Sequence, residues 1–401
     1  MTGREMSISA RFEYLSVMQE RYRVADRRAK SQLLDDMEAM THLSRKHLVA
    51  LMSRRVLHRR RRSRERERTY DGEVAEAIAI VADALDWDCA ERLQPRLRPT
   101  AERLIACGEM QVTPAGLDQM NQISISTVAR MLKHLRPTER LPRAYPGRRA
   151  DTSAQQAVPI ALIPWDEIEP GHFEVDLVHH GVPDETGRRV CTIQFIDVLT
   201  GWSERFAIMG TGFDAVWKAI QAFRDRCPIP IREVHTDNGS EFINWAFIAA
   251  FGQQMVGVSH TRGRPGYHND NRFVEQKNSS LVRAYLGSTP LHSFEQLRAL
   301  NHLYGEMWLY YNFYQPVLRQ VERTAVMGDD GIIRLRRRQD RARTPLERLL
   351  EAEPPIARET KERLQALYNT LNPLALKRSI HAQVAALRAM SAPIEEPSTL
   401  V

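Results

Sequence analysis

Apolar residues recur with the α-helical period near the start of the chain. Residues 31–40 and 44–55 carry apolar side chains three and four positions apart, with the short break "THL" between them. Ser44 is a favourable helix N-cap at the start of the second stretch. This pattern predicts two short helices joined by a tight turn, the outline of a helix-turn-helix. A small helical hairpin with no role in DNA binding fits the same pattern.

A second helical outline follows further along the chain. Thr113 and Pro114 form an N-cap and first-turn pair. Ser124 or Ser126 then caps a helix whose apolar face includes Val128 and Leu132. The stretch therefore predicts another helix-turn-helix-like unit, and two in tandem would read a longer DNA site than one.

The middle of the chain changes to strand patterns. "HFEVDLVHH", "RVCTIQFIDVL" and "WSERFAIMG" read as three strands in series, after which helix and strand patterns alternate as far as a long helix beginning near Asn271. Such an order predicts a mixed α/β sheet with helices on its faces. We divide the chain into an N-terminal helix-turn-helix domain with an arginine-rich segment (1–70), a second helical domain (71–136), a linker (137–160), an α/β core (161–320) and a basic, mainly helical C-terminal region with a disordered tail (321–401).

Charge is concentrated in two segments. The chain carries 57 Lys and Arg against 50 Asp and Glu, and nine arginines fall within 54–68 and six within 334–343. Two such runs favour a polyanionic partner such as nucleic acid over a merely solvated helix face. The sequence has no apolar run of membrane length and no signal sequence, so we expect a cytosolic protein without a membrane partner. The four cysteines form no CxxC pair, which argues against a disulfide framework or a cysteine zinc site.

Three acidic residues stand at informative positions in the α/β region. Asp176 lies inside the first predicted strand, Asp237 ends the fourth, and Glu275 falls in the first turns of the following helix. If the first and fourth strands are neighbours, the two aspartates lie about 5 Å apart. Converging carboxylates repel one another, and divalent cations remove that penalty. Two Mg²⁺ ions about 4 Å apart support phosphodiester displacement, so the set favours phosphoryl transfer on nucleic acid.

Each acid also has a structural interpretation. Asp237 precedes Asn-Gly and suits a turn, Asp176 could face solvent from a strand, and Glu275 could lie on an exposed helix face. Glu174 and Glu241 could join a metal site, although salt bridging or a helix N-terminal charge suits them better. The remaining polar residues near the strands are expected to be structural: Asp197, His179, His180 and His235.

Four motifs together resemble a known family. "FEVDLV", "IDVLTGW", "HTDNGSEFIN" and "NDNRFVEQKN" are similar, in order and spacing, to the integrase-type core of DDE transposases from bacterial insertion sequences, relatives of the retroviral integrases. The intervals, 237 − 176 = 61 and 275 − 237 = 38, are within that family's range. The resemblance implies an RNase H-like fold in which Asp176, Asp237 and Glu275 bind Mg²⁺ or Mn²⁺, as two ions.

The resemblance also implies further roles for residues around these motifs. Asn238, Gly239, Asn271 and Asn278 would support the site. The candidates for DNA contact, from the two helical outlines and from the region around the motifs, are Arg45, Lys46, His47, Arg130, Lys133, Arg262, Arg264, Lys277 and Arg283. Solvent-exposed charge is the alternative for Lys277 and Arg283. The retroviral zinc domain has no counterpart here, and 334–343 reads as helical, so no C-terminal barrel is expected.

The expected function is that of a transposase, a DDE polynucleotidyl transferase. It would bind the terminal inverted repeats of its element, cut DNA and join the 3′-hydroxyl to target DNA, working in the bacterial nucleoid as a homodimer or higher multimer on double-stranded DNA. Two alternatives stay open: a domesticated, non-catalytic DNA-binding regulator of the same fold, and an RNase H-like nuclease without strand transfer.

Overall fold

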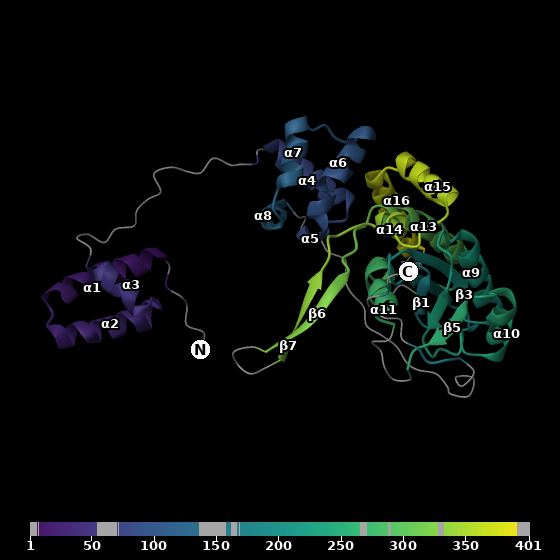
Figure 1. The fold of residues 1–401 in the computed structure, drawn as a ribbon, viewed down its shortest axis with the longest axis horizontal. Helices are drawn as coiled ribbons and strands as arrows, with labels where there is room; N and C mark the ends of the chain where they lie inside the picture. Colours follow the sequence, from purple (N-terminus) through teal and green to yellow (C-terminus); the bar gives the residue numbers. More distant parts are fainter. Residues whose placement is uncertain are drawn as a thin grey trace, which may run out of the picture. The chain divides into compact units, whose positions relative to one another are not determined.

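The computed structural model describes residues 8–53, 72–135, 169–264, 271–287, 290–327 and 333–390, with short pieces at 6, 70, 158–161 and 167. The chain forms two compact units, Met1–Thr69 and Tyr70–Val401, and each is considered by itself (Figure 1). The arginine-rich run 54–68 and most of the predicted linker lie outside the described residues.

The first unit consists of three helices. These are α1 (Ile8–Val24), α2 (Arg27–Thr41) and α3 (Arg45–Met52). They close around buried residues that include Leu15, Met37 and Leu48. The two helices predicted from periodicity correspond to α2 and α3, and His42, with a φ of 54°, ends α2. Helix α1 was not predicted, although it supplies one side of this small core.

The second unit begins with helices α4 (Gly72–Ala84), α5 (Ala90–Leu93), α6 (Leu97–Ala106), α7 (Pro114–Gln122) and α8 (Ile125–Leu135). A 3-10 turn (Gln94–Arg96) joins α5 to α6. Thr113 caps α7 as its sequence predicts, since its hydroxyl accepts a hydrogen bond of 3.1 Å from the Gly116 amide. These helices share one apolar core with the sheet that follows. That core contains Ile78 and Leu97 from the helices and Phe173 and Val175 from the sheet.

A five-stranded mixed sheet forms the centre of this unit. Its strands are β1 (His172–His179), β2 (Val190–Asp197), β3 (Ser203–Met209), β4 (Glu233–Thr236) and β5 (Ser259–Arg262), in the spatial order β3-β2-β1-β4-β5. Strand β2 is antiparallel to both β1 and β3, whereas β4 runs parallel to β1 and β5 parallel to β4. The predicted mixed α/β fold class is thus confirmed.

Helices cover both faces of the sheet. On one face, α9 (Phe213–Arg226) and α10 (Trp245–Gln254) pack against strand residues such as Phe195, whose ring stacks on Phe223 with centroids 4.1 Å apart. On the other face, Val178 and Val190 join a second core with α12 (Ala284–Leu286), α13 (Phe294–Phe313) and α16 (Pro373–Ala389). Successive residues of a strand point to opposite faces of the sheet, so each strand can contribute side chains to both cores.

The basic stretch at 334–343 is not helical, which corrects the prediction. Residues Gln320–Met327 (β6) and Ile333–Gln339 (β7) pair as an antiparallel ribbon, separate from the five-stranded sheet. Arginine suits helices, but "RLRRRQ" offers one apolar residue and no stripe to bury, and the preceding "QVERTAVM" is rich in residues that favour strands. Helices α14 (Pro345–Leu350) and α15 (Arg358–Thr370) follow the ribbon, as predicted.

Candidate active site

Asp176 on β1 and Asp237, the residue after β4, lie beside each other where these two strands pair. Strands β1 and β4 pair in parallel with Val175 opposite Thr236, so Asp176 and Asp237 are the next positions along the two strands. Neighbouring strands lie about 4.8 Å apart. The predicted adjacency of the first and fourth strands is therefore present.

Backbone amides orient both carboxylates. The Leu177 amide donates to Asp176 Oδ1 at 2.8 Å, and the Gly239 amide donates to Asp237 Oδ1 at 3.0 Å. Asn238 fixes the loop between them and β5, because its Nδ2 donates to the Gly263 carbonyl at 2.9 Å. The loop at "DNG" thus holds the Asp237 side chain through the Gly239 amide.

The electrostatics of this corner disfavour two unshielded negative charges. Burial raises the pKa of Asp176, and the neighbouring Asp237 raises it further. Burial also raises the pKa of Asp237, and the pKa of Glu241 rises through burial and through Asp237. A bound cation would reverse these shifts, because it stabilises the ionised carboxylates.

Glu275 lies on α11 (Arg272–Lys277), which packs on β1 and β2. It is exposed, and its charge is among the groups that raise the pKa values of Asp176 and Glu174. A π-helical segment (Asn278–Arg283) continues the helix, and Asn278 Nδ2 donates to Asp176 Oδ2 at 2.5 Å. Within the described ranges, no three His, Cys, Asp or Glu side chains gather closely enough to hold a metal ion. The site consists of an aspartate pair with Glu275 on the helix beside it.

Polar residues missed by sequence reasoning extend this site across the sheet. Gln194 on β2 lies opposite Asp176, and Arg205 on β3 lies opposite Gln194, so the three occupy one row of one face. Both are buried, and neither the Gln194 amide nor the Arg205 guanidinium makes a hydrogen bond within the described residues. Arg205 lies over the rings of Tyr304 and Tyr311, at 5.8 and 5.1 Å from their centroids. The sequence signal that could have identified them is the presence of Gln194 and Arg205 inside strand patterns that are otherwise largely apolar.

The donor set suits a hard divalent cation. Carboxylate and amide oxygens are the ligands that Mg²⁺ and Mn²⁺ prefer. Beside the aspartate pair, Asn278 Oδ1 is buried and makes no hydrogen bond within the described part of the chain. Asp176, Asp237 and this amide therefore fit such an ion, and Glu275 is the acid on the helix beside them.

The predicted DNA-binding residues fall in different environments. Lys46, His47, Arg130, Lys133 and Arg264 are exposed. Arg45 is bound to Asp35 and to Ser31 on α2. Arg262 is buried, and its guanidinium donates to the Val158 carbonyl and, at 2.8 Å, to Asn238 Oδ1. This position makes Arg262 a support of the Asp237 loop.

The two basic residues after Glu275 are half-buried. Burial, together with the nearby charges of Arg92 and Arg205, lowers the pKa of Lys277 to about 8. Arg283 ends the π-helical segment.

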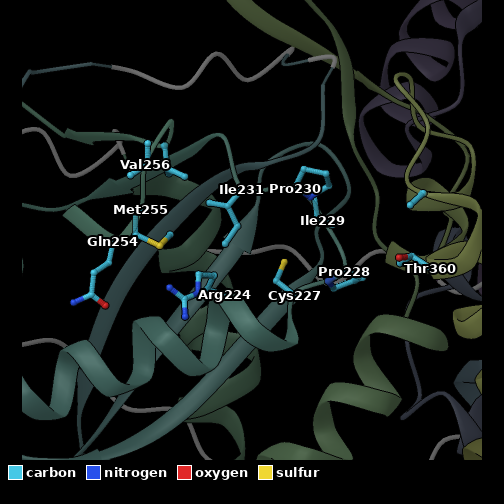
Figure 2. Close-up of a pocket in the computed structure, with 12 residues that line it drawn as sticks. Arg224, Cys227, Pro228, Ile229, Pro230, Ile231, Gln254, Met255, Val256 and Thr360 are labelled. Carbon is cyan, nitrogen blue, oxygen red and sulfur yellow. The ribbon is translucent and has the colours of Figure 1, made fainter. Parts of the chain in front are cut away.

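A cavity of about 400 Å³ opens at the opposite end of β4 from the aspartates (Figure 2). Its wall is formed by the end of α9, the segment before β4, the end of α10 and the start of α15, and includes Cys227, Ile231 and Met255. None of the predicted site residues lines it. Burial raises the pKa of the Cys227 thiol well above its usual value, so this cysteine is a poor nucleophile.

The chain thus has a five-stranded mixed sheet in the order β3-β2-β1-β4-β5, and the pairing of β1 with β4 brings Asp176 and Asp237 side by side. No family model matches the chain. The chain is 31% identical over 327 residues to the uncharacterized protein y4rM of Sinorhizobium fredii, across 81% of this chain and 92% of that protein. It therefore belongs to the same family as y4rM.

Solved structures of viral integrases are among the similar folds. The HTLV-2 integrase catalytic core in complex with magnesium aligns with 37% of this chain and 92% of its own, at 15% identity and a TM-score of 0.28. The simian T-cell lymphotropic virus intasome in complex with a PP2A regulatory subunit aligns with 54% and 70%, at 13% identity and a TM-score of 0.30. In the described part of the chain, no helix is both long and apolar enough to cross a membrane.

Proposed function

We propose that this protein is a DDE polynucleotidyl transferase that cleaves DNA and joins 3′-hydroxyl ends to target DNA, as the transposase of an insertion sequence. The observation that carries the proposal is the adjacency of Asp176 and Asp237 on parallel strands beneath the helix that bears Glu275. The two buried aspartates repel each other when both are ionised, Glu275 adds negative charge from the helix beside them, and a bound cation would offset that repulsion.

Asp176, Asp237 and Glu275 would hold one or two Mg²⁺ or Mn²⁺ ions. When bound, the metal supplies Lewis-acid activation of the attacking oxygen and stabilisation of the leaving oxygen. The chain's own contribution is orientation: the Leu177 and Gly239 amides aim the aspartates, and Asn278 holds Asp176 against the Glu275 helix. Because Asp237 stands at the end of a short strand, its loop sets the distance between the two carboxylates.

The flanking parts would supply DNA binding. Lys46 and His47 lie exposed at the start of α3, and Arg130 and Lys133 lie exposed on α8, so both helices offer positive charge to phosphates. Binding of two terminal inverted repeats calls for at least two copies of the chain, and we expect a homodimer or higher multimer on DNA.

A non-catalytic DNA-binding regulator is the second candidate. In that role Glu275, which is exposed on α11, would not join the aspartate pair in holding a metal ion. A nuclease of the same fold would cut DNA without joining. These roles differ in measurable products.

The test uses labelled element ends and a target plasmid with Mg²⁺. Wild type should nick the ends and join them, whereas Asp176→Asn, Asp237→Asn and Glu275→Gln should each lose at least about 100-fold in joining, because each removes a ligand charge. Binding of the ends should stay within about threefold of wild type. Asp225→Asn, an exposed acid at the end of α9, is the matched control and should join normally.

Three outcomes would contradict the proposal. If the wild type binds ends without cutting them, the protein is a regulator. If it cuts without joining, it is a nuclease. If joining persists in Asp237→Asn, that aspartate is not part of the site.

A further inference from the structure

The helix that carries Glu275 is capped from another strand. Asn271 occupies the N-cap position of α11, yet its side chain makes no capping hydrogen bond. Instead, Glu174 Oε2 accepts hydrogen bonds from the amides of Phe273 at 2.7 Å and Val274 at 2.9 Å. These are the second and third residues of the helix, whose amides an N-cap side chain ordinarily satisfies.

Glu174 is placed for this role by strand geometry. It lies on β1 two positions before Asp176, so both side chains project from the same face of the sheet. Its side chain is buried, with 1% of the residue exposed. Four residues after Val274, Asn278 bonds to Asp176, so the short stretch that contains Glu275 is fixed to β1 at both ends.

We propose that Glu174 is a positioning residue, which sets where Glu275 stands relative to Asp176 by capping α11 from the neighbouring strand. The inference rests on the proposed function for the meaning of Glu275, although the cap itself can be tested without DNA. Glu174 acts through the helix backbone, and it is not itself a metal ligand.

Two conservative variants distinguish the effect of side-chain length, which sets how far the oxygen reaches, from the effect of charge. Glu174→Gln keeps an acceptor oxygen at the same distance from the backbone and loses the charge. Glu174→Asp keeps the charge and withdraws the oxygen by one methylene. A positioning role depends on reach, whereas a ligand role depends on charge. Glu295→Asp is the matched control, because Glu295 is an exposed glutamate in the first turn of α13, a helix capped by Ser293.

The readouts are amide hydrogen exchange across 272–278 and affinity for Mn²⁺ alone, both on the full chain. We expect Glu174→Gln to retain slow exchange and to bind Mn²⁺ within about threefold of wild type. We expect Glu174→Asp to exchange faster at Phe273 and Val274 and to bind Mn²⁺ about 10- to 100-fold more weakly. The control should match wild type in both measurements.

The reverse pattern overturns the proposal: if Glu174→Gln loses Mn²⁺ and Glu174→Asp keeps it, Glu174 is a ligand. If both variants exchange and bind as wild type does, the cap positions nothing. If exchange changes as expected while wild type binds no Mn²⁺, the cap stands and the proposed function fails, so the two failures are distinguishable.

Discussion

At the scale of single residues, His180 shows how burial sets a charge state. Its Nε2 is 2.6 Å from the Thr192 hydroxyl, which is itself 2.6 Å from the Tyr304 hydroxyl. Burial lowers the pKa of His180 to about 4, and His179 and Arg283 contribute in the same direction. The imidazole is therefore neutral in the folded protein at neutral pH.

This shift predicts acid sensitivity. In the unfolded chain His180 takes up a proton near pH 6.5, but in the folded chain it does so only near pH 4. The free energy of unfolding should be fully retained above pH 6.5 and should fall as pH drops from 6.5 to about 4, by at most about 1.4 kcal/mol per pH unit for one group. Urea unfolding across this range should give a flatter profile for His180→Gln than for wild type. Equal slopes would show that His180 does not carry the effect.

At the scale of elements, the ribbon β6–β7 begins beside the candidate active site. Arg319, one residue before β6, lies over the ring of Phe273 on α11 at 5.0 Å. Asp340, one residue after β7, is held by Arg348 on α14 at 2.8 Å. Among the described residues, these two strands pair only with each other, and an isolated two-stranded ribbon is marginally stable. The major groove of DNA admits a two-stranded ribbon, so we expect DNA to be its partner.

Two exposed arginines of β7 test that expectation. Arg336→Gln with Arg338→Gln should weaken DNA binding and reduce the slope of log affinity against log salt by about 2, because each phosphate contact contributes about 0.9. Arg358→Gln on α15 is the control, since that arginine is also exposed and is paired with Glu362. An unchanged salt slope in the double variant would mean that the ribbon does not touch phosphates.

The same elements show what the sequence could and could not predict. Asp176 and Asp237 were identifiable because each interrupts or ends a strand pattern, and the pairing of β1 with β4 places them together. Glu174 as a cap, and Gln194 and Arg205 as neighbours of Asp176, depend on strand register and helix placement. Local pattern carries no information about either. The arginines of β7 suit a helix in sequence, and their strand conformation depends on pairing with β6.

At the scale of the whole molecule, the two compact units predict two separate unfolding transitions. Leu48 is fully buried in the core of the first unit, and Leu97 is fully buried in the core shared by α4–α8 and the sheet. In calorimetry, Leu48→Ala should destabilise only the unit with the smaller transition, and Leu97→Ala only the unit with the larger one. Each substitution should lower the free energy of unfolding of its unit by about 2–5 kcal/mol. A third transition that responds to Leu97→Ala alone would make residues 71–136 an independent domain.

The contacts between α4–α8 and the C-terminal helices have a consequence for how relatives diverge. Lys377 on α16 bonds to Asp83 at 2.7 Å, Asn372 bonds to Glu109 at 2.8 Å, and Arg96 pairs with Glu347. A recombination event that exchanged α4–α8 between two relatives would break these pairs unless the C-terminal helices were inherited with them. Whatever α4–α8 recognise, that specificity is expected to be inherited together with the C-terminal helices.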